Sequence, residues 1–280
     1  MENSIEIKEL TIRYPKFSLE NINLTVPCGM VMGLIGENGA GKSTTIKAIL
    51  GLLKPESGSV TVLGEDSGSL SREKKEQIGV VFDEMPFPDN LTGKQLDKVL
   101  GGIFRNWDSG VFFGYLRKFW LPLDKKLKSF SRGMQMRISI AAALSHDPRL
   151  LVLDEPTGGL DPVMRSEILD ILLEFMQDET HSILISTHIT SDLEHIADYI
   201  GFIHNGRLIF VQERNEMMEQ HRILKCSEEE LSRIDPADII GMRKGRFSNE
   251  VLTKAAEKYP DITQDAPGID EIMVYYVKEK

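Results

Sequence analysis

The first part of the chain alternates hydrophobic and polar residues in a way that predicts β-strands separated by turns. Residues 4–12 and 19–26 each alternate over several positions, and residues 58–63 follow a Pro-Glu-Ser-Gly turn. Alternation with a period of two is typical of strands that bury one face. We therefore expect an antiparallel β subdomain at the N-terminal end.

A second set of hydrophobic runs is uninterrupted and is interleaved with helical patterns. Short apolar runs bounded by turn signals are typical of strands buried on both faces. Strands that alternate with helices indicate a mainly parallel sheet covered by helices on both faces, so the fold class is α/β. The buried strands are expected at 30–35, 78–82, 150–153 and 182–186, and the helices at 44–53, 162–176 and 191–196.

The pattern becomes purely helical in the middle of the chain. Apolar residues recur there at helical spacing in three stretches, 91–104, 108–119 and 133–144. Such a block inside an alternating α/β pattern is typical of an insertion. We expect a helical subdomain at about 88–146.

From residue 213 onward the pattern of hydrophobic and charged residues changes again. Two charged stretches, 213–221 and 248–258, have helical patterns and flank short strand-like pieces, and 271–277 alternates weakly. We therefore expect the main domain to occupy residues 1–212 and a small α+β appendage to occupy 213–280. The appendage carries no motif, so dimer support, regulation and stabilising packing all stay open for it.

Composition and charge narrow the class of protein. The chain is 41% hydrophobic and 27% charged, as ordinary globular proteins are. Its formal net charge is -10, whereas surfaces that bind nucleic acid usually carry a basic excess. The balance therefore argues against a nucleic-acid partner.

The sequence also bears on where the protein resides. No run approaches the roughly 18 apolar residues that a membrane span needs, and the first residues lack the basic and apolar regions of a signal peptide. Cys28 and Cys226 lie far apart without metal-binding spacing, which fits a reducing compartment. We expect the chain to be cytoplasmic.

A phosphate-binding motif follows the first buried strand. Residues 36–43 fit the pattern G-x-x-x-x-G-K-[ST], in which backbone N–H groups and a helix N-terminus form a concave anion site. A plain glycine-rich turn is the alternative, and the position between an apolar strand and a helix favours phosphate binding. In the motif the lysine reaches the β and γ phosphates and the serine hydroxyl ligates Mg²⁺. The residues predicted to hold the nucleotide here are Asn38, Gly39, Ala40, Gly41, Lys42, Ser43 and Thr44.

Two carboxylates end another buried strand. Asp154 and Glu155 follow four apolar residues, at the edge where parallel sheets bind ligands. Asp154 is suited to hold Mg²⁺ as the acidic partner of Ser43, and Glu155 to act as the general base that orients or deprotonates the attacking water. Taken alone, the pair could instead cap a helix.

A third constellation opens a helical pattern. Ser131 and Gly133 lie in the sequence Ser-Phe-Ser-Arg-Gly-Met-Gln-Met-Arg, where backbone N–H groups and the helix dipole can form a second anion site. On composition alone, Ser131 is an ordinary cap of an amphipathic helix.

Together these motifs resemble the nucleotide-binding subunit of an ABC (ATP-binding cassette) transporter, a P-loop NTPase. The resemblance covers residues 4–212 and follows the family's order of motifs, with Phe-Ser-Arg-Gly-Met at 130–134 in place of the usual LSGGQ signature. It implies that Tyr14 stacks on adenine, that Asp161 belongs to the D-loop, and that His188 is the switch histidine that contacts the γ-phosphate.

The chain departs from the family's pattern at two places. Asp83, followed by Glu84, stands where the family usually has a glutamine, and aspartate could still offer an oxygen to Mg²⁺. In the signature, Arg132 occupies a position that is usually glycine, and Met134 one that is usually glutamine. Such signatures resemble those of drug, antimicrobial-peptide and lipid exporters.

The resemblance implies a mechanism that needs two cassettes. In the family, the signature of one chain covers the ATP bound to the other, so two identical or related chains enclose two ATP molecules with Mg²⁺. Hydrolysis, with Glu155 and His188 as the catalytic residues, then lets the halves part. The expected function is an ATPase that drives a separate transmembrane permease, peripheral on the cytoplasmic face of the membrane.

The sequence leaves other interpretations open for the contact with the permease and for the class of transport. The family's docking site implies that residues 82–88, with Met85 and Phe87, lie near the permease, although the same apolar residues could form a core turn. An importer ATPase, a non-transport ABC ATPase of the repair or translation class, and a cassette that binds ATP without hydrolysing it are the other readings. The transported compound cannot be inferred from the chain.

Overall fold

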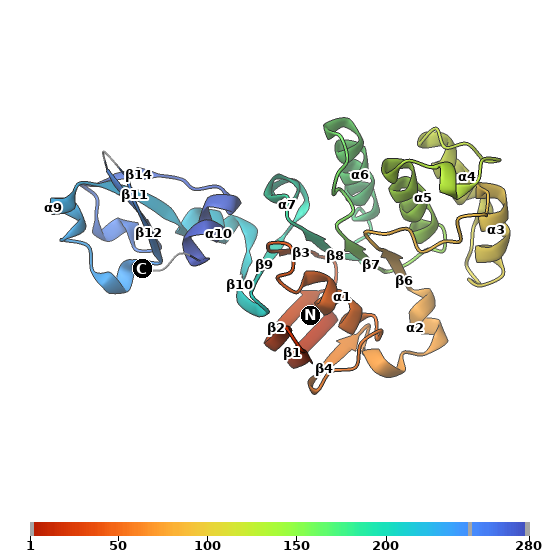
Figure 1. The fold of residues 1–280 in the computed structure, drawn as a ribbon, viewed down its shortest axis with the longest axis horizontal. Coiled ribbons are helices and arrows are strands. Elements are labelled where there is room, and N and C mark those ends of the chain that lie inside the picture. The colour runs from red at the N-terminus through yellow and green to blue at the C-terminus, as the bar shows by residue number, and fades with distance from the viewer. Residues whose placement is uncertain (1–2, 246–247, 278–280) are drawn as a thin grey trace.

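The computed structural model describes residues 3–245 and 248–277. Its centre is a six-stranded sheet in which neighbouring strands are parallel, apart from the antiparallel pair at one edge (Figure 1). The mainly parallel sheet that the apolar runs predict is thus confirmed. In spatial order its strands are β10 (Arg207–Glu213), β9 (Tyr199–His204), β3 (Val31–Ile35), β8 (Ser182–Thr187), β7 (Leu150–Asp154) and β6 (Ile78–Val81).

A second sheet is antiparallel and comes from the N-terminal part of the chain, as the alternation of residues predicts. It lies beneath the central sheet in Figure 1. Its strands, in spatial order, are β2 (Phe17–Pro27), β1 (Asn3–Tyr14), β4 (Ser57–Val62) and β5 (Glu65–Asp66).

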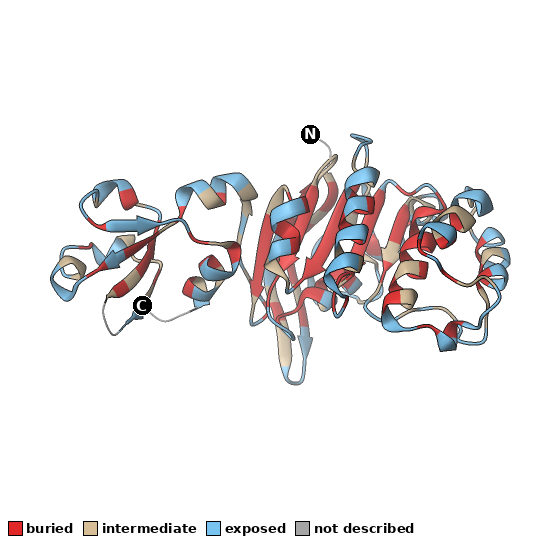
Figure 2. Ribbon diagram, turned by 90° about the horizontal axis from the view of Figure 1, so that it is seen from above, coloured by how far each residue is buried: buried red, intermediate tan, exposed pale blue. Residues whose placement is uncertain are grey.

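The central strands contribute side chains to two separate hydrophobic cores, because successive side chains point to opposite faces of the sheet. In β7, Leu150 and Val152 pack with the antiparallel sheet and α1 (Lys42–Ile49), whereas Leu151 and Leu153 pack on the other side. Figure 2 shows the result, with buried central strands and helices whose outer faces are exposed. The helices that cover the second face are α5 (Arg132–Leu144), α6 (Pro162–Phe175) and α7 (Thr190–Ile196).

The helix predicted at residues 44–53 both begins and ends earlier than expected. It starts at Lys42 and ends at Ile49, because Gly51 takes a φ of 66°, a conformation that favours glycine and stops the helix. A short unit of regular structure that the sequence analysis did not predict follows on the chain. It comprises η1 (Ser67–Ser69) and α2 (Arg72–Glu76).

The middle of the chain forms the predicted helical insertion. Its helices are capped by side chains: Thr92 and Gln95 form a reciprocal capping box, and the Asp108 carboxylate accepts the N–H of Val111. The elements before α5 are α3 (Gly93–Gly101), α4 (Ser109–Lys118) and η2 (Leu127–Ser129).

His146 is buried and joins this insertion to α2. Its ring stacks on Phe104 with centroids 4.1 Å apart, and its Nδ1 lies 3.1 Å from the Glu76 carbonyl oxygen. Burial lowers the pKa of His146 below its ordinary 6.5. The unfolded chain therefore binds a proton near pH 6.5 that the folded chain resists, so acid favours unfolding.

We expect the free energy of unfolding to fall as the pH drops below 6.5 towards the lowered pKa of His146, by up to about 1.4 kcal/mol per pH unit for one histidine. Urea unfolding of wild type and His146→Gln at pH 7, 6 and 5 measures this, and the variant should show a shallower pH dependence. His195→Gln, which alters an exposed histidine, is the matched control. Equal pH dependence in wild type and His146→Gln would refute the expectation.

The C-terminal part forms a third sheet with short helices, the α+β arrangement that the sequence predicts. Its buried residues join the main core through α10 and the start of β11 and also form a small core of their own. The strands, in spatial order, are β12 (Gly241–Lys244), β13 (Asn249–Thr253), β11 (Arg222–Cys226) and β14 (Thr263–Asp265). The helical elements are α8 (Arg214–Gln220), α9 (Glu228–Leu231), η3 (Pro236–Asp238), η4 (Ala256–Lys258) and α10 (Ile269–Val277).

Two secondary-structure predictions for this part are wrong. The stretch 248–258, predicted as a helix, contains the strand β13, because both β11 and β12 pair with it. The stretch 271–277, predicted as weakly alternating, belongs to α10, in which Ile269, Ile272 and Tyr275 are buried at a spacing of three. The boundary between 212 and 213 stays a prediction.

Membrane-spanning helices are absent from the described residues. None of their helices is both long enough and apolar enough to cross a bilayer.

Candidate nucleotide site

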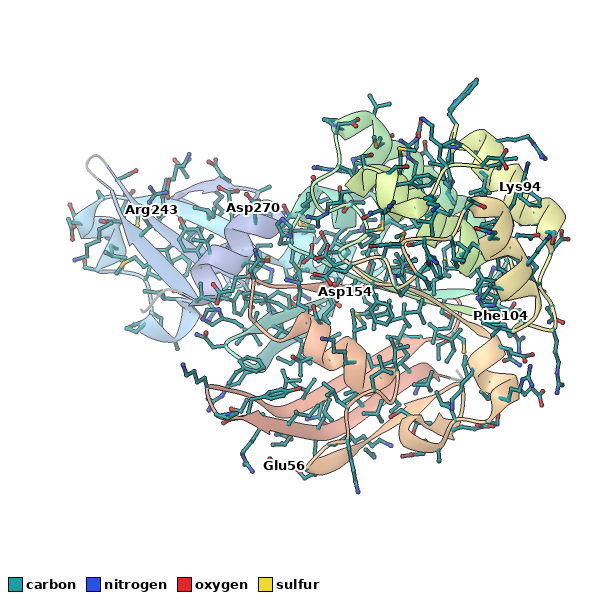
Figure 3. The ribbon with its side chains drawn as sticks, turned by 45° about the vertical axis from the view of Figure 1, so that its right-hand side comes forward. Glu56, Lys94, Phe104, Asp154, Arg243 and Asp270 are labelled. Atoms are coloured by element: carbon teal, nitrogen blue, oxygen red, sulfur yellow. The ribbon has the colours of Figure 1, made fainter. Side chains whose placement is uncertain are left out.

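The ends of three neighbouring strands meet at one edge of the central sheet. In spatial order β3, β8 and β7 are parallel, and Ile35 pairs with Thr187 while Asp154 pairs with Ser186. Their carboxyl ends therefore bring the phosphate-binding loop, the switch histidine and the two carboxylates together. Asp154 lies at the centre of the molecule in Figure 3.

The phosphate-binding loop depends on a glycine at the start of α1. Gly41 has a φ of 121°, which side-chain-bearing residues rarely adopt, and a Cβ there would lie 2.5 Å from Cδ2 of Leu19. Its carbonyl accepts both the N–H and the hydroxyl of Thr45, which fixes the first turn of the helix. The loop thus delivers Lys42 and Ser43 at a helix N-terminus, where backbone N–H groups are free for an anion.

A cavity of about 570 Å³ opens at this loop. Its volume lies in the range of small-molecule sites. One side is made by predicted residues of the loop, namely Asn38, Gly39, Gly41, Lys42, Ser43 and Thr44. The rest of the wall is made by Lys16, Phe17, Asp83 and Glu155.

Lys42 and Glu155 line this cavity, and together with His188 they form a continuous chain of charge-assisted contacts. Nζ of Lys42, whose side chain is only 5% exposed, lies 3.1 Å from Oε1 of Glu155 and donates to the Gly36 carbonyl at 2.8 Å. Nδ1 of His188 donates to Oε2 of Glu155 at 2.7 Å. The carboxylate of Glu155 is thus held between two donors and aimed at the loop.

The backbone of Glu155 is strained in a way that aims its side chain. Its φ is 51°, a left-handed conformation that costs a residue with a side chain about 1–2 kcal/mol. Its N–H donates to both the carbonyl and the hydroxyl of Ser186, which hold the conformation in place. Strain of this kind persists only where surrounding structure fixes it.

Asp154 is buried directly beside this turn. Its Oδ1 accepts the Ser186 hydroxyl at 2.6 Å, and the side chain is almost wholly shielded from solvent. Ser186 therefore positions both carboxylates, through the side chain of Asp154 and the backbone of Glu155. Sequence analysis gave Ser186 no role of its own, because serine in an apolar strand carries no local signal.

Three predicted residues lie outside this cavity and at the starts of two helices. Within the described residues, the cavity wall includes none of Ser131, Gly133 and Asp161. Ser131 caps α5 by accepting the N–H of Met134, and Asp161 caps α6. A Cβ on Gly133 would lie 2.9 Å from the sulfur of Met164, so this glycine also lets α5 and α6 pack closely.

Two further predicted residues occupy other places around the loop. Ala40 is buried beneath it, with its N–H donated to the Glu37 carbonyl. Tyr14 is exposed at the end of β1, opposite Phe17 in the hairpin, so its stacking on adenine stays a prediction. Sequence analysis missed Lys16, in the turn after Tyr14, and Phe17, at the start of β2.

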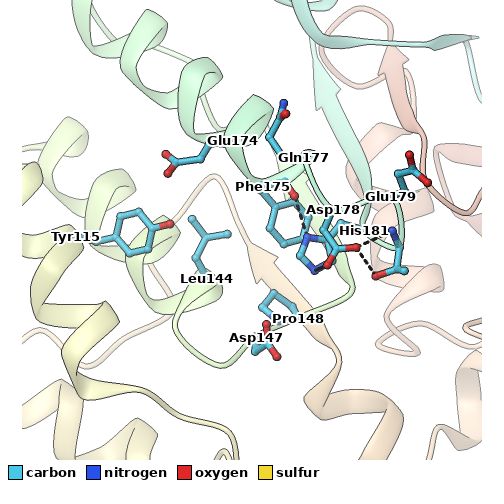
Figure 4. A pocket seen from close by; sticks show the side chains of 11 residues that line it. Tyr115, Leu144, Asp147, Pro148, Glu174, Phe175, Gln177, Asp178, Glu179 and His181 are labelled. Carbon is cyan, nitrogen blue, oxygen red and sulfur yellow. Dashed lines mark hydrogen bonds and ion pairs between the residues drawn. The ribbon is translucent and has the colours of Figure 1, made fainter.

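A larger cavity of about 820 Å³ lies elsewhere, where the end of α5 faces the end of α6 (Figure 4). Its lining is acidic, with the carboxylates of Asp147, Glu174, Asp178 and Glu179 around His181. This lining repels a triphosphate, so the smaller cavity at the loop is the better candidate for a nucleotide site.

The strand β3 leads through a glycine-rich loop into α1, and the buried Lys42 faces Glu155, which directly follows the parallel strand β7. This arrangement defines a P-loop NTPase. Three comparisons with known proteins narrow this class. The family model described as ABC transporter matches residues 19–158.

Relatives of known name agree with this match. The chain is 40% identical over 212 residues to the lantibiotic transport ATP-binding protein SrtF of Streptococcus pyogenes, covering 75% of this chain and 90% of that one. It is 38% identical over 229 residues to the bacitracin transport ATP-binding protein BcrA of Enterococcus faecalis, covering 79% and 73%.

A solved structure, described as the ATP binding subunit of an ABC transporter, matches with a TM-score of 0.69 and 29% identity, over 77% of this chain and 92% of that one. The chain belongs to the ABC transporter family, and it is an ATP-binding subunit that hydrolyses ATP.

Proposed function

We propose that the chain powers an exporter of antimicrobial peptides or drugs by binding MgATP between two cassettes and driving a separate permease on the cytoplasmic face of the membrane. The observation that carries the proposal is the contact of Glu155 with both Lys42 and His188 at the phosphate-binding loop. The relatives named for lantibiotic, bacitracin and fluoroquinolone transport support the export of such compounds.

The catalytic step follows from these contacts. Lys42 contacts Glu155 and the Gly36 carbonyl, and the γ-phosphate of ATP offers it a stronger anionic partner. Once Lys42 turns to the phosphate, Glu155 is free to accept a proton from the attacking water. His188 contacts Glu155 through Nδ1, and in its doubly protonated form, in which both ring nitrogens donate, its Nε2 can also donate to the γ-phosphate, so it orients base and substrate together.

The donor set of the site fits Mg²⁺. Ser43 and Asp83 line the cavity and Asp154 lies beside it, so the three offer the hard oxygen atoms that Mg²⁺ prefers. Among the described residues, no group of three or more His, Cys, Asp or Glu could hold a metal by itself, which suits an ion shared with the phosphates. When bound, the ion neutralises charge on the phosphates that would otherwise resist attack.

The need for a second cassette follows from where the signature lies. Ser131 and Gly133 stand at the N-terminus of α5, outside the cavity that Lys42 lines in the same chain. A helix N-terminus favours an anion, so this end of α5 is suited to the γ-phosphate held by another copy or a related chain. ATP then joins the two cassettes, and hydrolysis lets them part.

An apolar groove supports docking to the permease. It has a volume of about 790 Å³ and lies where the end of α1, α2 and the end of α3 meet β6. Leu52 and Ile103 line it and are 60% and 52% exposed, unusual values for large apolar side chains. Met85 and Phe87 are instead half-buried against the main core, so we assign the contact chiefly to Leu52 and Ile103.

Replacing Leu52 and Ile103 together by aspartate should abolish recruitment to the membrane, because two buried carboxylates oppose docking of an apolar helix. The measurement is the fraction of tagged chain in washed membranes of the native host, with ATPase activity of the purified chain measured in parallel. Val274→Asp, at another exposed apolar position, is the control. Undiminished membrane binding of the double variant would exclude this groove as the docking site.

A further inference from the structure

The two departures of this sequence from the family's pattern touch each other. The guanidinium of Arg132, at the first position of α5, donates to the carboxylate of Asp83 at 2.5 Å, although the two residues are 49 positions apart. Asp83 follows β6 and lines the nucleotide cavity, whereas Arg132 does not belong to its wall. The ion pair therefore joins the signature helix to the cavity of the same chain.

Arg132 also lies close to the loop that follows Glu155. A Cβ added to Gly158 or Gly159 would stand 3.5–3.6 Å from its guanidinium atoms, so the space beside these glycines is occupied by Arg132. One side chain thus bridges α5, the loop after β6 and the loop after β7. A shift of α5 would therefore move Arg132 relative to both loops.

The charges of the cavity explain why such a pair matters. Its wall carries two carboxylates, those of Asp83 and Glu155, and must accept a nucleotide with several negative charges. Glu155 is paired with Lys42 and His188. Asp83 has Arg132 as its cationic partner, so without Arg132 an uncompensated negative charge would face the phosphates.

We propose that Arg132 is a positioning residue that neutralises Asp83, so that the cavity admits ATP while the start of α5 stays tied to it. The inference deepens the proposed function and rests on ATP binding at this cavity. Arg132 acts through Asp83, not on the nucleotide held in its own chain. The pair thereby keeps Asp83 from opposing the nucleotide that Lys42 and the loop bind.

The test compares Arg132→Gly, Asp83→Gln and the double variant, which carry the residues usual in the family. ATP affinity is measured by calorimetric titration in EDTA, so that no metal contributes. We expect Arg132→Gly to bind ATP about three- to tenfold more weakly, as an exposed carboxylate next to a polyanion predicts. The double variant should remain within twofold of wild type, because it removes both charges of the pair, and Asp83→Gln should bind ATP at least as tightly as wild type, because it removes a carboxylate from beside the polyanion.

Three controls separate this role from a structural one. Arg132→Lys should restore most of the affinity, and Arg117→Gly, which removes another exposed arginine of the helical insertion, should not alter it. The defect of Arg132→Gly should shrink when salt is raised from 50 to 500 mM, because screening weakens exposed charges. A misfolded variant would not recover with salt.

The outcomes are distinct. Wild-type affinity in Arg132→Gly, or a double variant as weak as Arg132→Gly, would overturn the proposal. So would a loss of affinity in Asp83→Gln, because removing a carboxylate from beside a polyanion cannot weaken binding if charge is the cause. If wild type itself bound no ATP, the proposed function would fail instead.

Discussion

Glu155→Gln should lower the rate of ATP hydrolysis by about 10²–10⁴-fold while leaving ATP binding intact. The amide keeps the size of the carboxylate and can still accept from His188, but it cannot take a proton from water. Its loss of charge also releases Lys42, which lies 3.1 Å from Oε1, so the lysine stays available for phosphate. Phosphate release under saturating MgATP and ATP binding by calorimetry measure the two parts separately.

The same variant should accumulate as an ATP-bound dimer, because two cassettes joined by ATP part only after hydrolysis. Light scattering of Glu155→Gln with and without MgATP reports the mass, alone and with its membrane partner and any companion cassette. Glu179→Gln, which removes an exposed carboxylate, is the matched control and should resemble wild type. Turnover within tenfold of wild type would remove Glu155 from catalysis, and a persistent monomer would refute the two-cassette arrangement.

Lys42→Met should weaken ATP binding by about 10- to 150-fold, the range for losing one hydrogen bond to a charged group. Methionine fills nearly the same buried space, so the fold is kept, but the cation at the phosphate-binding loop is gone. Glu155 also loses one of its two partners and adds uncompensated negative charge to the cavity. Calorimetric titration with ATP in EDTA measures the loss.

Lys47→Met is the control for this variant, because it removes an exposed lysine from the same helix. Its ATP affinity should match wild type. If Lys42→Met bound ATP as tightly as Lys47→Met, the loop at residues 36–44 would not be the phosphate site.

Most of the ATPase fold could be predicted because it depends on local patterns. The buried strands read as apolar runs, and the helices of the insertion begin at side-chain caps. The β9–β10 hairpin was missed, although its Asn205-Gly206 turn, with both φ values positive, is a strong local signal. In the C-terminal part, β13 is a strand because two distant strands pair with it, which no local pattern reveals.

The residues of the candidate site likewise fall into those that local sequence patterns predict and those that only the fold reveals. Lys42 and Ser43 are recognised from one contiguous motif, and Asp154 and Glu155 from the end of one strand. The contact of Arg132 with Asp83 and the double role of Ser186 arise only when separate segments fold together. Sequence reasoning proposes the reacting groups but misses the contacts that hold them in place.

The division of β7 between two cores makes the site sensitive to the length of its strand. Leu150 and Val152 face one core, and Leu151 and Leu153 face the other. Deleting or inserting a single residue would exchange these faces and shift both acidic residues along the sheet edge. Such a change would disrupt the hydrophobic packing and the catalytic geometry at once, so evolution at β7 should proceed by substitution at constant length.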